Sequence, residues 1–198
     1  MQKVTLDPKT SYVEYYSELP QEIQWSLEDF VSVWDQHPEE HGKFSIYGKE
    51  IDIPRWQKVY LHDYSFSKVK HKADNKVPAP VEKLLKWVHT QGEDKTVNGI
   101  IVNWYQNGHH YIGWHKDDTK QLIKESRIWS FSFGQEREFS LKSVKTDKVN
   151  KFKMSNNSLI VMCGTLQETH KHAVLKVNGK KGEKLGHRIN VTFRSFKK

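Results

Sequence analysis

Two short segments in which apolar and polar residues alternate restrict the fold more than any other feature of the chain. They are residues 127–133 and 188–194. Successive side chains of a β-strand point to opposite faces of the sheet, so each segment predicts a strand with one buried apolar face. The apolar faces consist of Trp129, Phe131 and Phe133 and of Ile189, Val191 and Phe193. Strands of this kind need a second layer that covers those faces.

Helical spacing marks two segments in the N-terminal half of the chain. Ser26-Leu-Glu-Asp29 has the form of a capping box, which predicts a helix start. A second helix is predicted over residues 81–90, between Pro80 and Gln91-Gly92. The apolar positions with a period near 3.6 are Leu27, Phe30, Val31 and Trp34, and then Val81, Leu84, Leu85 and Val88. We therefore expect an α+β, mainly β fold, a two-sheet sandwich or jelly roll with helices that buttress one side.

Length and charge indicate one basic domain. At 198 residues the chain is long enough for one domain with a hydrophobic core and too short for two domains of ordinary size. Its net charge of +8 fits a polyanionic partner such as nucleic acid, and fits simple solubility equally well. Two lysine-rich segments, 142–153 and 178–184, are expected to be exposed as solvated turns, with phosphate-binding patches as the alternative.

Cysteine content and hydropathy give expectations about the compartment. The single cysteine, Cys163, excludes an intramolecular disulfide and is expected to be a small core residue within the apolar run 159–163. No stretch is apolar for long enough to span a membrane, and the N-terminus lacks the apolar segment of a signal peptide. We expect an intracellular protein of a reducing compartment, nucleus or cytoplasm, and a monomer.

His115, Asp117 and His172 have the chemistry of a non-haem iron site. Residues i and i+2 of a strand point to the same side, so His115 and Asp117 can bind one ion from one strand. His172 would then come from a distant strand. Two imidazoles and one carboxylate form the facial triad that holds Fe(II) and leaves other positions open. A histidine and an aspartate at this spacing are also common without a metal, so the neighbouring segments decide the interpretation.

Four further polar residues can surround a small anion beside that set. Asn103 and Tyr105 share one face of a predicted strand, and Arg188 and Arg194 lie on the polar face of the last strand. Arginine binds carboxylates through bidentate, charge-assisted hydrogen bonds. Salt bridges on an exposed strand face are the alternative, and the adjacent metal set favours anion binding.

The longer motifs around these residues resemble a known family. They are residues 103–118 (NWYQNGHHYIGWHKDD), 128–139 (IWSFSFGQEREF), 158–172 (SLIVMCGTLQETHKH) and 188–194 (RINVTFR), with weaker counterparts at 53–60 and 64–67. In order and spacing they resemble the AlkB-type Fe(II)/2-oxoglutarate dioxygenases, specifically the branch that demethylates nucleic-acid bases. The resemblance covers about residues 45–196.

That resemblance implies a double-stranded β-helix, or jelly roll, with N-terminal buttressing helices. It also implies that His115, Asp117 and His172 are the catalytic ligands of Fe(II). His172 fits the family pattern Met-x-Gly-x-x-Gln-x-x-x-x-His, whereas His170 does not. His109 and His110 are expected to be loop residues rather than ligands.

The same resemblance implies how 2-oxoglutarate, the co-substrate, is bound. Arg188, helped by Tyr105, would pair with its distal carboxylate. Arg194 and Asn103 would hold its iron-chelating end.

The resemblance also implies four substrate contacts. Asp118 would lie near the substrate base, and Arg55 and the segment 64–66 would form a lid over the nucleic acid. Phe66 or Tyr64 would stack on a flipped base, since an enzyme that acts on base atoms takes the base out of the stack. A core contact is an equally good interpretation of Phe66. The sequence departs from the family after the distal histidine, where it reads HAVLK at residues 172–176.

The expected organisation is a single dioxygenase domain, 1–198. It would comprise a helical N-terminal extension (1–45), a substrate-lid segment with a buttressing helix (46–90) and a jelly-roll core (98–196). The implied reaction is oxidative demethylation of N-alkylated bases in DNA or RNA, which reverses alkylation damage and releases formaldehyde, succinate and carbon dioxide. The alternatives are a 2-oxoglutarate-dependent protein hydroxylase or demethylase, and a non-enzymatic β-sandwich that binds nucleic acid.

Overall fold

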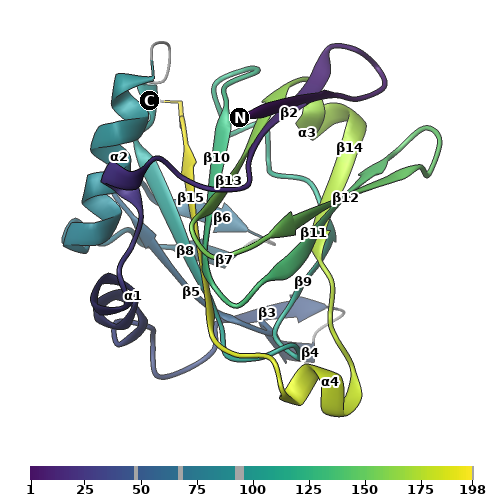
Figure 1. Ribbon diagram of the computed structural model, residues 1–198. Coiled ribbons are helices and arrows are strands. Elements are labelled where there is room, and N and C mark those ends of the chain that lie inside the picture. Colours follow the sequence, from purple (N-terminus) through teal and green to yellow (C-terminus); the bar gives the residue numbers. More distant parts are fainter. Residues whose placement is uncertain (47–48, 67–68, 92–95, 198) are drawn as a thin grey trace.

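Two β-sheets face each other in the computed structural model, and the longer helices lie along the outer side of the larger sheet (Figure 1). The structure describes residues 1–46, 49–66, 69–91 and 96–197, with the backbone alone at residues 45, 46, 66 and 69. Among the described residues, no helix has both the length and the apolar character needed to cross a bilayer.

Within the described residues the larger sheet has seven antiparallel strands. Their spatial order is β1 (Gln2–Thr5), β2 (Ser11–Tyr16), β13 (Ser158–Gly164), β10 (Ile128–Gly134), β15 (Arg188–Arg194), β8 (Gly99–Tyr105) and β5 (Trp56–Tyr60). The smaller sheet contains, in order, β12 (Val149–Met154), β11 (Arg137–Ser143), β14 (His170–Val174) and β9 (Ile112–His115). Two sheets of this topology confirm the predicted jelly roll.

Helices and two hairpins complete the described structure. The hairpins are β3 (Lys43–Ile46) with β4 (Lys49–Asp52) and β6 (Tyr64–Phe66) with β7 (Val69–His71). The helices are the 3-10 turn η1 (Gln21–Ile23), α1 (Leu27–Trp34), α2 (Ala79–Thr90), α3 (Leu166–Thr169) and α4 (Gly179–Glu183). The helix predicted over 81–90 is confirmed as α2, which begins two residues earlier than expected.

The predicted alternation in the last strand is confirmed, and it separates two hydrophobic cores. Ile189, Val191 and Phe193 are fully buried in the core between the larger sheet and the helices. The second core fills the space between the two sheets and includes Ile128, Leu141 and Ile160. The polar face of β15 therefore points toward the smaller sheet, where a purely structural core would carry apolar side chains.

Two expectations about the N-terminal segment were wrong. Residues 1–45 are not helical throughout, because β2 extends the larger sheet by pairing with β13, and β1 pairs with the outer side of β2. In α1, Leu27 is 79% exposed and Val31 is 46% exposed, although the helical spacing of Leu27, Phe30, Val31 and Trp34 indicated one buried face. The helix instead turns Val33 inward, and Trp104 Nε1 donates a hydrogen bond to the Val33 carbonyl at 3.0 Å.

The two lysine-rich segments are more ordered than the expected turns. Residues 142–153 include the end of β11 and most of β12, so that only the tip of this hairpin is a turn. Residues 178–184 contain the short helix α4, in which Gly182 is buried. The buried Gly182 accepts a hydrogen bond from the Gly108 amide at 2.9 Å, which attaches α4 to the turn after β8.

The capping box at the start of α1 is present as predicted. Ser26 Oγ accepts from the Asp29 amide at 3.1 Å, and Asp29 Oδ2 accepts from the Ser26 amide at 3.0 Å. We expect Ser26→Ala to lower the free energy of unfolding by about 1 kcal/mol, because it leaves a helix N–H without its partner. Urea denaturation measures this change. Ser32→Ala in the same helix is the matched control, and an equal loss in both variants would contradict the capping role.

Candidate metal centre and co-substrate cavity

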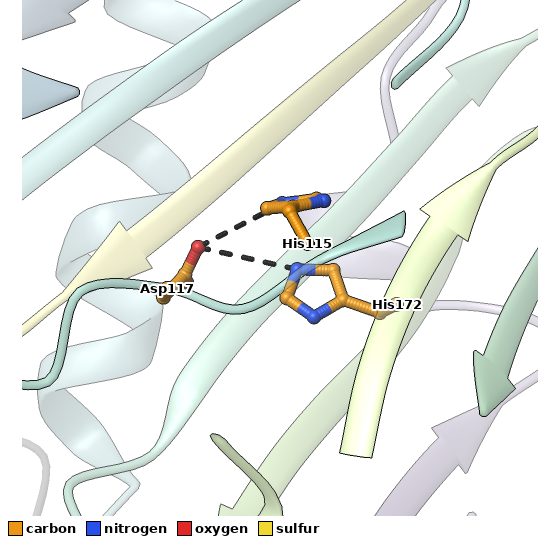
Figure 2. A group of neighbouring side chains, drawn as sticks. All are labelled: His115, Asp117 and His172. Atoms are coloured by element: carbon orange, nitrogen blue, oxygen red, sulfur yellow. Dashed lines mark ion pairs between the residues drawn. The ribbon is translucent and has the colours of Figure 1, made fainter. Parts of the chain in front are cut away.

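The fold brings His115, Asp117 and His172 together on the side of the smaller sheet that faces the larger sheet (Figure 2). His115 ends β9 and lies directly opposite His172 of β14 in the strand register. Asp117 lies two residues after the end of β9. The expectation that His115 and Asp117 belong to the same strand was therefore wrong. One ligand atom from each of the three residues lies within 4.8 Å of the other two.

The geometry of the three side chains fits a single metal ion. The Nε2 atoms of His115 and His172 each lie 3.9 Å from Asp117 Oδ1, so these three atoms face a common point. Asp117 Oδ2 is directed elsewhere and accepts a hydrogen bond from Arg194 Nε at 2.8 Å. Two imidazole nitrogens and one carboxylate oxygen are a donor set that suits non-haem Fe(II) and leaves part of the coordination sphere open.

The charge states of the three residues also suit a metal. Burial lowers the pKa of His172 to about 3, with a further contribution from His115. Burial likewise lowers the pKa of His115. Burial alone would raise the pKa of Asp117, but Arg194 and the two imidazoles outweigh it and hold that pKa well below its ordinary value. Near neutral pH the set therefore offers two neutral imidazoles and one carboxylate, the protonation states that metal binding requires.

Neighbouring groups orient two of the three residues. His115 Nδ1 lies 2.9 Å from the Gly113 carbonyl, which accepts only, so Nδ1 carries the proton and Nε2 keeps its lone pair. The Asp117 amide donates to Gln167 Oε1 at 3.0 Å, and Lys116 Nζ donates to the Glu168 carbonyl. The segment after β9 is thus attached to α3, which explains why Asp117 leaves the strand.

A cavity between the sheets is lined by two of the three residues, His115 and His172, and by two arginines. Its lining consists of Asn103, Tyr105, Ile112, His115, Ser130, Phe139, Met162, His172, Val174, Arg188, Asn190, Thr192 and Arg194. Arg188 is 2% exposed and donates from Nη2 to Ser132 Oγ at 2.9 Å. Within the described structure its buried Nε and Nη1 have no hydrogen-bond partner. A buried guanidinium with free donors is poised for a carboxylate.

Arg194 and Asn103 line the cavity, and they also form hydrogen bonds with side chains that the sequence did not indicate. Arg194 is paired with Asp117, while its buried Nη1 has no hydrogen-bond partner in the described structure. Asn103 Oδ1 accepts from Arg55 Nε at 2.8 Å and from Gln57 Nε2 at 2.9 Å. Each residue therefore orients a neighbour as well as facing the cavity.

The expected substrate contacts lie in different surroundings. Arg55 is buried rather than on an exposed lid, and it lines a second cavity that also reaches His115. Tyr64 is buried near Arg194, and burial, followed by Asp117, raises its pKa to about 12. Asp118 is exposed and accepts a hydrogen bond from Gln121. Phe66 lies on β6, but its side chain lies outside the described residues.

The sequence interpretation gave no role to several residues that shape the site. Gln167 fixes the Asp117 amide, and Ser132 holds Arg188. The signal for Ser132 was present, because it alternates with the aromatic residues of 127–133 and so had to face away from the helices. Gln167 is part of the family pattern that ends at His172, but nothing in its spacing indicated which group it would contact. His170 does not belong to the group formed by His115, Asp117 and His172. His109 and His110 lie in the turn after β8.

Comparison with known proteins then assigns the family. The sequence profile of the 2OG-Fe(II) oxygenase superfamily matches residues 10–194. The chain belongs to this superfamily. The donor set and the cavity arginines described above fit the Fe(II) and 2-oxoglutarate that the superfamily uses.

The relatives place the chain among the AlkB-type members. It is 29% identical over 169 residues to the mouse "DNA oxidative demethylase ALKBH2", and 28% identical over 191 residues to the human protein of that name. These matches cover 78% and 90% of this chain, and 67% and 68% of the relatives, so the chain spans about two thirds of their length. A match to the mouse "Alpha-ketoglutarate-dependent dioxygenase alkB homolog 3" has 27% identity and covers 59% of this chain and 42% of the relative.

A solved structure supports the fold. The structure titled "The structure of OsALKBH1" superimposes with a TM-score of 0.55, and covers 92% of this chain and 97% of its own, at 14% sequence identity. This likeness concerns the fold alone, and it agrees with the jelly roll described above. Membership of the superfamily makes the protein a dioxygenase whose cofactor and co-substrate are Fe(II) and 2-oxoglutarate.

Removal of one negative charge tests the metal centre. We expect Asp117→Asn to weaken Mn(II) binding by more than about 100-fold, because the change removes the only carboxylate of the donor set. Isothermal titration calorimetry measures the affinity. Asp118→Asn removes the same charge from the exposed neighbouring residue and serves as the control. Equal affinities of the two variants would show that Asp117 is not a ligand.

Proposed function

We propose that this protein removes N-alkyl groups from bases of nucleic acid by oxidation, and so directly reverses alkylation damage. The reaction consumes 2-oxoglutarate and oxygen and releases succinate, carbon dioxide and, from a methyl group, formaldehyde. His115, Asp117 and His172 bind Fe(II), and Arg188 receives the distal carboxylate of 2-oxoglutarate.

One observation carries this proposal: the two histidines of the cluster formed by His115, Asp117 and His172 line a cavity that also contains the buried, incompletely bonded guanidinium of Arg188. The metal position and the arginine mark the two ends of a site for a chelating dicarboxylate. A protein that only binds nucleic acid has no need of this combination.

A nucleic-acid base is the substrate that best fits the second cavity. This cavity adjoins His115 and is lined largely by apolar and aromatic side chains, among them Phe44, Tyr111 and Trp114. A flipped base is flat and can stack on such side chains. The net charge of +8 is compatible with a polyanionic substrate. The names of the mouse and human relatives support DNA in particular.

The residues of the chain have defined tasks in this reaction. When bound, Fe(II) supplies the oxygen activation that couples decarboxylation of 2-oxoglutarate to hydroxylation of the N-methyl group. Arg194 holds Asp117 ionised and oriented, and Gln167 fixes the adjacent backbone. Arg188 anchors the co-substrate, and the apolar and aromatic side chains of the second cavity would receive the flipped base.

Mass spectrometry of short oligonucleotides tests the function. DNA and RNA versions that carry 1-methyladenine or 3-methylcytosine are incubated with Fe(II), ascorbate and oxygen, with and without 2-oxoglutarate. We expect loss of the methyl group only with 2-oxoglutarate. Asp117→Ala should abolish this loss, because the donor set is incomplete.

Two other results would contradict the proposal in different ways. Succinate formation without demethylation would retain the dioxygenase but point to a protein or another lesion as substrate. Tight oligonucleotide binding by iron-loaded protein, with neither succinate nor demethylated product, would indicate a binding module.

A further inference from the structure

Arg137 is a buried arginine outside the set of residues that line the co-substrate cavity. It begins β11 and is 4% exposed. No carboxylate of the described residues forms an ion pair with it, and its guanidinium donates to backbone carbonyls instead. A buried charge without a counterion is costly, so its retention calls for a physical reason.

The carbonyls that Arg137 binds belong to the segments that carry the site. Nη1 donates to the carbonyls of Asn107 at 3.2 Å and His110 at 3.1 Å, both in the turn between β8 and β9. Nη2 donates to the carbonyl of Leu175 at 2.8 Å, directly after β14. Because β8 carries Tyr105 while β9 and β14 carry the two histidines, Arg137 fastens all three strands at one end.

Arg137 also adds positive charge beside the anion site. Its guanidinium carbon lies 6.0 Å from the centre of the Tyr105 ring, and that of Arg188 lies 4.8 Å from the same centre. Burial, followed by the charge of Arg188, lowers the pKa of Arg137 to about 10. Two cations thus flank one ring, and an anion that binds Arg188 relieves their mutual repulsion.

We propose that Arg137 is a positioning residue for the dicarboxylate co-substrate, which fixes the turn after Tyr105 and adds a second positive charge behind Arg188. The site then selects a dianion over a monoanion. This inference rests on the proposed function, in which Arg188 receives the distal carboxylate.

Binding of two 2-oxo acids separates the electrostatic role from a purely structural one. 2-Oxoglutarate and 2-oxopentanoate share the chelating end and chain length, but a methyl group replaces the distal carboxylate in the second. Their affinities for the Mn(II)-loaded protein are measured by calorimetry. The variants are Arg137→Met, Arg137→Lys, Arg188→Met and, as a control, Lys83→Gln. Lys83 is an exposed residue of α2 and has the same charge.

We expect the wild-type protein to bind 2-oxoglutarate more tightly than 2-oxopentanoate. Arg137→Met should reduce this preference about tenfold, because only the dianion has a distal carboxylate that interacts with the removed charge. Arg137→Lys keeps the charge and should stay within about threefold of wild type. Lys83→Gln should leave the preference unchanged. Arg188→Met should remove most of it.

An equal loss of affinity for both acids in Arg137→Met, or no loss for either, would overturn the inference. If Arg137→Met does not fold, as judged by thermal unfolding, Arg137→Lys decides: a tenfold loss of preference in this charged variant would also overturn it. A wild-type protein without preference, or a preference that survives Arg188→Met, would instead show that the distal carboxylate does not bind Arg188. The proposed site would then be wrong, and the inference would fail with it.

Discussion

The division of β15 into an apolar and a polar face is the constraint on which the rest of the structure depends. β15 pairs with both β10 and β8 in the middle of the larger sheet. Its apolar face completes the core under the helices, so its polar residues must face the smaller sheet, where burial requires partners for them. These residues line the cavity that we propose for the co-substrate, and this cavity exists because β15 is central and buried on both sides.

The charges inside this space are unequally compensated. Arg194 and Asp117 neutralise each other at 2.8 Å, which also orients the carboxylate for a metal. Arg188 and Arg137 have no carboxylate partner among the described residues. In the proposed function, a dianionic co-substrate would supply the missing negative charge at the cavity, so the arrangement that destabilises the empty site would favour the loaded one.

Prediction from the sequence succeeded where local pattern and final environment agree. The strands at 127–133 and 188–194, the capping box at Ser26 and the burial of Val81, Leu84 and Val88 follow from period and side-chain chemistry. It failed where the environment decides, as for the exposed Leu27 and the strands β1 and β2, which form because β13 offers an unpaired edge. The motif around His115 indicated which residues would meet a metal, but gave no contact for Gln167 or Arg137.

The sequence by itself therefore determined the strand pattern and the helix starts, because each depends on residues that are close along the chain. The family resemblance pointed to His115, Asp117 and His172 as a donor set, although His172 is far from the other two along the chain. The tertiary structure decided that His172 lies opposite His115 and that Asp117 leaves β9 for α3. It also decided that Arg55 is buried against Asn103, and that Arg137 joins the turn after β8 to the end of β14. These contacts join residues far apart in sequence, and they form only when two sheets pack and buried polar groups must find partners.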